Sequence, residues 1–451
     1  MKRTVTKLRD VRSPRIGILC HLGLLSITTS VIATYSLPAF AQSAQAPHST
    51  CVQPPGPAAL IVPTHIFKPI TPSHGTPTMV NPLRQNTSSP LKMLTLGDSA
   101  VWGNGLRYRT KYSYKVAQDV ANATGRTVNL VSFAHSGANL SNEANSDYEP
   151  LMPSDGGTPP GDLNAGLPTT IQQEACAHTD PRSSDAEIIL LDGCINEVGA
   201  QRIALPFPFS GATVGEIAQR SHQWCSDKML ALLQSTKSDF PNATIVVSNY
   251  WLIISDKSSP IGVAQRAAQR HMLSLVEAER KAEQATGQSV TESRLFSDPK
   301  ALLQRWSGNS KVFLKTSQRC FEWAIAYANG TTSAPNGSDG TGDDNQCPAV
   351  PPAQPRLATK DFRVYLATVS DDSNYSYGAP KKRLWSVPVP IIRPDELYTK
   401  RSILCKTHYS PSDIGDRFIC PINPTAHPNV RGAEAFRESI TRILEVAWKG
   451  P

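Results

Sequence analysis

Short apolar runs alternate with longer amphipathic stretches along much of this chain. The runs are rich in Leu, Ile and Val and read as buried strands. They lie at residues 92–96, 127–133, 187–192, 244–250 and 362–369. Because helical patterns separate them, the sequence predicts an α/β fold with a parallel, doubly wound sheet. Ligands of such sheets bind outside the carboxyl ends of the strands, so residues that do chemistry should follow strands directly.

Apolar residues at helical spacing define the stretches between and after the strands. Gly125 ends the first of these stretches, because glycine suits the left-handed conformation of a helix C-terminus. In the last stretch, Phe436, Ile440 and Leu444 share one face. The predicted helices span residues 112–124, 169–177, 213–234, 261–286, 299–328 and 433–449, and a loop rich in Gly, Ser, Asp and Pro is expected at 329–355.

The N-terminal segment has a different pattern. Basic residues precede an apolar run from Ile16 to about Ile32, and Ala39-Phe40-Ala41 forms a small-x-small cleavage site. Residues 1–41 therefore read as a signal peptide, with an uncleaved membrane anchor as the alternative. No later segment is apolar for long enough to span a bilayer. We expect a secreted or periplasmic protein with no stable membrane span after signal cleavage.

Composition separates two further parts of the chain. Residues 42–90 hold ten Pro among 49 positions without sustained periodicity, which predicts a Pro-rich linker or a surface-wrapping arm. Regular patterning begins at Leu91. Residues 91–451 are expected to form one domain, with a helical and loop insertion at about 256–360 before the C-terminal segment.

The charge of the chain is concentrated in the signal. Six of the 45 Lys and Arg and one of the 37 Asp and Glu lie in residues 1–41, so the formal charge falls from +8 to +3 when they are removed. A balance this close to neutral gives no reason to expect a nucleic-acid partner.

The cysteines indicate disulfides. One of the nine, Cys20, lies in the signal, and an even number in an exported chain predicts up to four bridges. No C-x-x-C pair occurs, which argues against structural zinc. Cys405–Cys420 is the first expected pairing, because the two flank one short loop. The remaining candidates are Cys51, Cys176, Cys194, Cys225, Cys320 and Cys347.

Polar clusters directly follow the first two strands. In Gly97-Asp98-Ser99, glycine lets the backbone turn sharply and the serine is exposed at the strand end. A serine hydroxyl is a weak nucleophile that needs an adjacent base. After the second strand comes Ser136-Gly137-Ala138-Asn139, where Gly137 can offer its backbone N–H to a developing oxyanion. Alone, the first motif is equally compatible with an ordinary polar turn, and for the second an ordinary turn is the favoured interpretation.

Two more clusters complete the set. Residues 192–197 follow the third strand, and Asn196 can donate its side-chain N–H to the same oxyanion. His427-Pro428-Asn429 precedes the final helix, where His427 can act as the base for Ser99. In isolation, a loop-capping Asn and a surface His are the alternatives.

Together the four clusters resemble the SGNH, or GDSL-type, hydrolase superfamily. The stretch LGDSAVWGNGL at 96–106 is similar to the first block of that family, and Gly137, Asn196 and His427 fall on its second, third and fifth blocks. The resemblance covers roughly residues 91–255 and 360–449. It implies a flavodoxin-like three-layer α/β/α fold and an esterase or lipase. It also implies an oxyanion hole of the Ser99 and Gly137 backbone N–H groups and the Asn196 side chain.

The third block departs from the family pattern. That block is usually Gly-x-Asn-Asp, whereas here one extra residue separates Gly193 from Asn196 and Glu197 replaces the Asp. The Asn expected to be catalytic is kept.

The second departure concerns the base. The Asp that usually lies three residues before the His is replaced by Pro424. An Asp in that role holds the imidazole in the correct tautomer, and its loss can cost about 10⁴ in kcat. Three interpretations stay open. A backbone carbonyl near residues 423–426 orients His427, or Asp413 or Asp416 supplies the carboxylate, or the chain only binds.

The expected activity is that of a carboxylic ester hydrolase acting through an acyl-enzyme on Ser99, with no metal or organic cofactor required. The substrate would be a lipid, a small acyl ester or an acetylated polysaccharide. An acyltransferase would use the same residues, and a non-catalytic glycan- or lipid-binding relative is the third hypothesis. The sequence does not separate hydrolase from transferase, because both share the acyl-enzyme, and it leaves the oligomeric state open.

Overall fold

The computed structural model describes residues 64–69, 89–141, 168–200, 203, 213–259, 299–330, 347, 362–385, 398–408, 421 and 425–449. All of them belong to the compact unit that spans Ser49–Pro451. The expected signal at 1–41, the helix expected at 261–286, and Asp413 and Asp416 lie outside the described residues.

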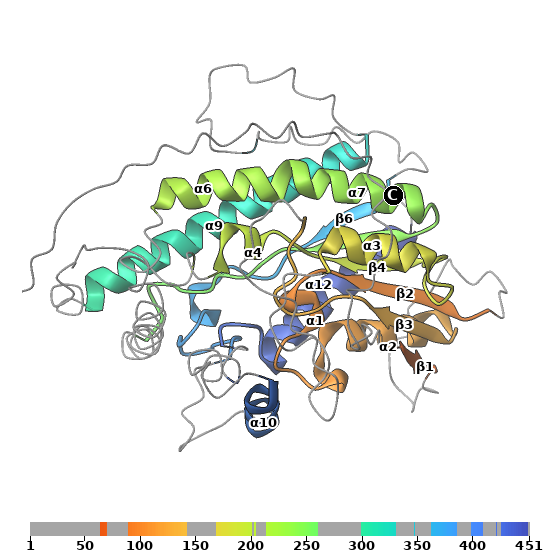
Figure 1. Ribbon diagram of the computed structural model, residues 1–451, viewed down its shortest axis with the longest axis horizontal. Helices are drawn as coiled ribbons and strands as arrows, with labels where there is room; N and C mark the ends of the chain where they lie inside the picture. Colours follow the sequence, from red (N-terminus) through yellow and green to blue (C-terminus); the bar gives the residue numbers. More distant parts are fainter. Residues whose placement is uncertain are drawn as a thin grey trace, which may run out of the picture. The chain divides into compact units, whose positions relative to one another are not determined.

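The described strands form one mostly parallel sheet (Figure 1). Its order is β1-β3-β2-β4-β5-β6, and only β1 runs antiparallel to its neighbour. The order of the parallel strands is the 2-1-3-4-5 of flavodoxin-like folds. The predicted α/β fold class is therefore confirmed. The strands are β1 (Thr64–Phe67), β2 (Leu91–Leu96), β3 (Val128–Ser132), β4 (Ile188–Leu191), β5 (Thr244–Ser248) and β6 (Val364–Ala367).

Helices cover both faces of the sheet, which gives three layers (Figure 1). On one face α2 (Tyr112–Thr124) packs on β3, and α12 (Val430–Lys449) packs on β5 and β6. On the other, α3 (Thr170–Thr179) packs on β2, and α9 (Pro299–Ala328) packs on β6 and on α7 (Met229–Asp239). The bounds of α2 and α9 match those predicted from sequence.

Several elements differ from the sequence prediction. The helix expected at 213–234 consists of α6 (Val214–Gln223), a π-helical segment (Trp224–Lys228) and α7, so it extends five residues further. The pattern also gave no sign of α10 (Tyr398–His408) or of two single-turn helices, α1 (Ser99–Trp102) and α4 (Ile195–Val198). The two single-turn helices carry too few residues for a helical period, and their glycine-containing surroundings favour loops. The polar sequence of α10 gives no clear apolar face.

β1 comes from the Pro-rich stretch at 42–90 that the sequence predicts to be a linker or a surface-wrapping arm. It pairs with β3 over residues 64–67 and so adds an antiparallel strand to the edge of the sheet. Phe67 is its buried residue and packs edge-on against Tyr114 of α2. Among the described residues, no helix combines the length and apolar character that crossing a membrane requires.

Two disulfides are described in full. Cys320–Cys347 links α9 to the stretch expected as a Gly-rich loop, and Cys194–Cys225 links the start of α4 to the π-helical segment. Cys176 and Cys405 are also disulfide-bonded. The pairing expected for Cys405 involves Cys420, which lies outside the described residues.

A carboxyl pair lies between α3 and α7 and should make stability depend on pH. Burial, followed by the neighbouring Asp239, raises the pKa of Glu174 from 4.5 to about 8. Because the folded value exceeds the unfolded one, stability from this group is complete below pH 4.5 and is lost as pH rises through 8. We expect Glu174→Gln, which cannot ionise, to melt several degrees above wild type at pH 9.

Thermal unfolding followed by circular dichroism at pH 5 and pH 9 checks this expectation. The two proteins should melt at similar temperatures at pH 5. If the difference in melting temperature between wild type and Glu174→Gln were the same at pH 5 and at pH 9, this would contradict the proposed ionisation of Glu174. Glu438→Gln, at a helix surface position, is the matched control.

Candidate active site

The turn after β2 can be made only with glycine. Gly97 has φ of +136°, and a Cβ there would lie 2.0 Å from Oδ1 of Asp192. Asp98 then caps α1, because its Oδ1 accepts a hydrogen bond from the Ala100 N–H at 2.8 Å. Ser99 is therefore the first residue of a capped helical turn at the carboxyl end of β2.

The base expected from sequence lies against the expected nucleophile. His427 Nε2 is 2.7 Å from Ser99 Oγ, although 328 residues separate them in sequence. Ser99 is 6% exposed. This is the nucleophile–base contact required for serine activation.

Backbone pairing holds the turn that carries His427. The Trp385 N–H donates to the His427 carbonyl at 2.9 Å, and the Ala426 N–H donates to the Trp385 carbonyl at 3.1 Å. The indole N–H of Trp251, which follows β5, donates to the Ala426 carbonyl at 3.0 Å. Residues on both sides of His427 are thus fixed to the 383–385 segment or to the end of β5.

Asn429 closes this turn and starts the last helix. Its Oδ1 accepts hydrogen bonds from the Arg431 and Gly432 N–H groups at 2.9 and 3.1 Å, which caps α12. Its Nδ2 donates to the Leu384 carbonyl at 3.1 Å. The His-Pro-Asn motif therefore combines the residue expected to act as the base with a residue that has a structural role.

The third member of a triad stays a prediction. Asp413, Asp416 and residues 423–424 lie outside the described residues.

The residues expected to bind an oxyanion occupy neighbouring loops. Gly137 follows β3 with φ of +80°, and Asn196 lies in α4 after β4. Asn196 Nδ2 donates to the Ala138 carbonyl at 2.7 Å, which fixes its amide beside the Gly137 turn. Within the described part of the chain, neither the Ser99 nor the Gly137 backbone N–H is hydrogen-bonded to a protein acceptor.

Glu197, which follows Asn196, has a structural contact. Glu197 is buried, and its carboxylate accepts a hydrogen bond from the Leu140 N–H. Burial raises the pKa of Glu197 to about 7, although hydrogen bonds from backbone N–H groups, that of Leu140 first among them, act to lower this pKa. Glu197 and Asn196 therefore both bind the loop that carries Gly137.

A buried carboxyl network beneath Ser99 was not foreseen from sequence. Asp192 Oδ1 accepts from the Asp98 N–H and its Oδ2 from the Val101 N–H, each at 2.7 Å. The Tyr250 hydroxyl donates to Asp98 Oδ2 at 2.8 Å. Burial raises the pKa of Asp98 to about 6, and burial together with the charge of Asp98 raises the pKa of Asp192 well above its usual range. The position of Asp192 at a strand end was the available signal.

Asp192→Asn is expected to lower kcat for ester hydrolysis about 10- to 100-fold, because an unpaired buried donor costs about 1–3 kcal/mol. The Asn amide has one acceptor oxygen instead of two, so its NH₂ group would face the N–H of either Asp98 or Val101. Initial rates with a p-nitrophenyl ester measure the effect. Asp185→Asn, at an exposed carboxylate that pairs with Lys92, is the matched control. Wild-type kcat with a reduced melting temperature would limit Asp192 to a structural role.

The described residues contain no group of three His, Cys, Asp or Glu side chains placed to hold a metal ion. What they bring together is a hydroxyl, an imidazole, two backbone N–H groups and a carboxamide around the carboxyl ends of β2, β3 and β4. Such a set can attack a carbonyl carbon and stabilise the resulting oxyanion.

No family model and no curated protein matches the chain. A solved structure that it resembles is the extracellular lipase of Streptomyces rimosus, with 12% identity, a TM-score of 0.36, and coverage of 78% of this chain and 98% of the lipase. Phospholipase A1 of Streptomyces albidoflavus is 10% identical, with a TM-score of 0.35 and coverage of 79% of this chain and 100% of the phospholipase. A family two carbohydrate esterase of Clostridium thermocellum is 10% identical, with a TM-score of 0.31 and coverage of 79% of this chain and 65% of the esterase.

Proposed function

We propose that this chain is a secreted carboxylic ester hydrolase with Ser99 as nucleophile and His427 as general base. The observation that carries the proposal is the 2.7 Å contact between Ser99 Oγ and His427 Nε2 at the carboxyl end of a parallel sheet. A hydroxyl in contact with an imidazole at a turn fixed by glycine and a buried carboxylate suits acyl transfer better than binding alone.

The proposed reaction proceeds in two halves. His427 Nε2 takes the proton as Ser99 Oγ bonds to the ester carbonyl carbon, and the same proton then goes to the departing alcohol. The Ser99 and Gly137 N–H groups and the Asn196 amide stabilise the negative carbonyl oxygen. Water, activated by His427, then attacks the acyl-enzyme and releases a carboxylic acid and free Ser99. These groups suffice without a cofactor.

Activity-based labelling tests the serine without knowledge of the substrate. A fluorophosphonate should label the purified chain at Ser99, as read by mass spectrometry of the tryptic peptide, and Ser99→Ala should take up none. Ser136→Ala, which changes a buried serine of the Gly137 turn, should still be labelled at Ser99. A wild-type chain that is not labelled would contradict an activated serine.

Turnover of short- and long-chain p-nitrophenyl esters then tests the reaction and ranks acyl chain lengths. Product partition in the presence of a competing alcohol separates hydrolase from acyltransferase, since both pass through the same acyl-enzyme. A wild-type chain indistinguishable from Ser99→Ala on every ester would point instead to the non-catalytic, glycan- or lipid-binding alternative.

A further inference from the structure

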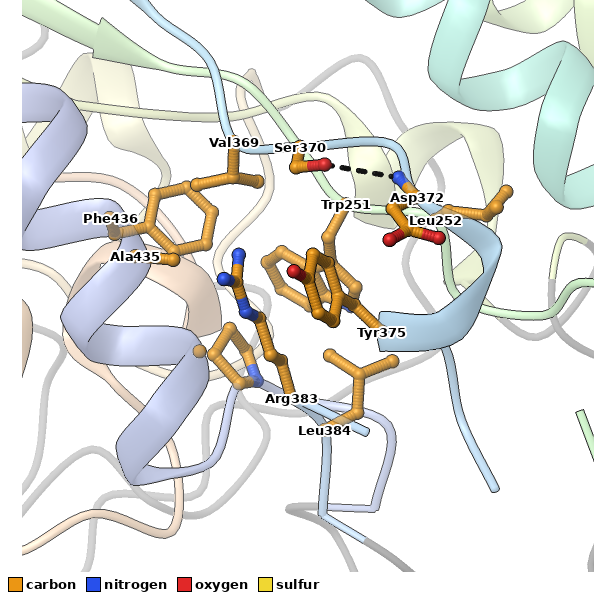
Figure 2. Close-up of a pocket in the computed structure, with 12 residues that line it drawn as sticks. Trp251, Leu252, Val369, Ser370, Asp372, Tyr375, Arg383, Leu384, Ala435 and Phe436 are labelled. Atoms are coloured by element: carbon orange, nitrogen blue, oxygen red, sulfur yellow. Dashed lines mark hydrogen bonds between the residues drawn. The ribbon is translucent and has the colours of Figure 1, made fainter. Parts of the chain in front are cut away.

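A hollow lies beside the His427 turn, between the ends of β5 and β6 and the start of α12 (Figure 2). About 320 Å³ of space lies between the lining residues when the open solvent at its mouth is included, so the hollow is a shallow one and not a closed cavity. Trp251 and Pro428 belong to its wall and also adjoin His427, whose ring centroid is 6.4 Å from that of Trp251. The hollow is therefore a neighbour of the proposed catalytic pair, but it contains neither member of it.

A cationic group reaches into this hollow. In Figure 2 the Arg383 side chain has the Trp251 and Tyr375 rings on one side and Phe436 of α12 on the other. Its guanidinium carbon lies 3.7 Å from the centre of the Tyr375 ring. No described residue accepts a hydrogen bond from this guanidinium, whereas the backbone of Arg383 is fixed by Asn429 at 2.8 Å. The planar donor fork is thus held in place and available to an oxyanion.

The remaining wall is mostly hydrocarbon. Leu252, Val369, Leu384, Ala435 and Phe436 contribute aliphatic or aromatic surface, and Leu384 and Phe436 are nearly fully buried. A ligand that fills the hollow would therefore place a short apolar group against these side chains. Apolar walls with one convergent charged group are typical of sites for small organic ligands.

A carboxylate at the rim limits the charge of the ligand. Asp372 lines the same hollow, and its Oδ1 accepts hydrogen bonds from the Asn374 backbone N–H and Nδ2, each at 2.9 Å. The Asn374 N–H, with smaller effects of Lys381 and Arg383, lowers the pKa of Asp372, so this residue is ionised at neutral pH. Its negative charge disfavours a dianion such as a phosphate monoester more than a singly charged carboxylate.

We propose that this hollow is a binding site for short-chain organic carboxylates, with Arg383 as the group that binds the anion. The proposal concerns a site distinct from the Ser99–His427 pair and does not require the proposed hydrolase activity. A carboxylate of this class is what ester cleavage would release, so the bound acid could be a reaction product or an acid from another source. In either case the recognition is the same: a guanidinium for the carboxylate and apolar walls for the chain.

Isothermal titration of the purified chain with hexanoate tests the site. We expect binding at neutral pH, at least about tenfold weaker in Arg383→Gln, because a charge-assisted hydrogen bond is lost. Arg383→Lys should retain part of the affinity for hexanoate. Arg431→Gln removes one positive charge from an exposed position at the start of α12, and it should change the dissociation constant by less than about twofold. Uncharged hexanamide should bind at least about tenfold more weakly than hexanoate.

Two controls separate this site from the proposed catalytic one. Ser99→Ala and Asn196→Ala should bind hexanoate like wild type, whether or not any ester is turned over. Binding that survives Arg383→Gln but is lost in Asn196→Ala would place the acid in the proposed oxyanion hole and overturn the proposal. Absence of hexanoate binding to wild type at tens of millimolar would overturn it as well. A chain with no esterase activity that binds hexanoate through Arg383 would refute the proposed function alone.

Discussion

Alanine at either Ser99 or His427 is expected to lower kcat for ester hydrolysis by about 10⁴-fold or more, and the double variant should be no worse than the poorer single one. The two atoms that would share the proton lie 2.7 Å apart, so neither residue can act without the other. Removing the base leaves an unactivated hydroxyl, and removing the hydroxyl leaves a base with no nucleophile. The effects of residues that act as a unit do not add.

Stopped assays with a p-nitrophenyl ester, run at high enzyme concentration, measure these rates against the uncatalysed reaction. His178→Ala, at an exposed helix position, is the matched control and should keep wild-type kcat. Additive losses in the double variant would show that Ser99 and His427 act in separate steps. A His427→Ala variant with substantial activity would mean that another group serves as base.

The sheet was predictable because its signal is local and strong. Parallel strands covered on both faces must be apolar at nearly every position, as in the fully buried Ile188–Leu191, so their runs stand out from the amphipathic helices. The alternation of such runs with helices defined a doubly wound sheet, and with it the edge at which chemistry should occur. Strand ends then located Ser99, Gly137 and Asn196.

The parts that were not predictable depend on contacts across long sequence distances. The antiparallel edge strand β1 has four residues and a single buried side chain, too few to give a period. Similarly, no pattern in the sequence around Asp192 indicates that its carboxylate accepts hydrogen bonds from two N–H groups more than 90 residues earlier. The pairing of residues 383–385 with the His427 turn has the same character, since backbone hydrogen bonds leave no residue signature.

The disulfide that flanks the proposed oxyanion site illustrates a related limit. Cys194 directly precedes α4 and has φ of +95°, a backbone conformation that residues other than glycine rarely adopt. Its bridge to Cys225 ties this strained residue to the π-helical segment on another helix. Cysteine number predicted bridges, but the partner depends on how a helix packs on the sheet, which sequence spacing does not provide.

Alanine at Asn196 is expected to lower kcat about 10²- to 10³-fold, the usual cost of one oxyanion donor, with a smaller change in KM. The amide makes one hydrogen bond to the Ala138 carbonyl, and a carboxamide carries a second N–H that can serve the oxyanion. Because the oxyanion forms only in the transition state, its loss should appear in kcat rather than in substrate binding.

Asn196→Ala also removes the tether to Ala138, so the two effects must be separated. Asn329→Ala is the control, because Asn329 Nδ2 donates to the Val364 carbonyl at 2.8 Å near the opposite end of the sheet. Asn329 Oδ1 also accepts from the Arg363 and Val364 N–H groups, so this variant loses at least as many backbone hydrogen bonds as Asn196→Ala. Both variants should have a lower melting temperature than wild type. Only Asn196→Ala should have a lower kcat and a weaker affinity for a trifluoromethyl ketone that mimics the tetrahedral intermediate. Equal affinity of wild type and Asn196→Ala for that ketone would remove Asn196 from the oxyanion hole. The hole would then consist of the Ser99 and Gly137 N–H groups alone.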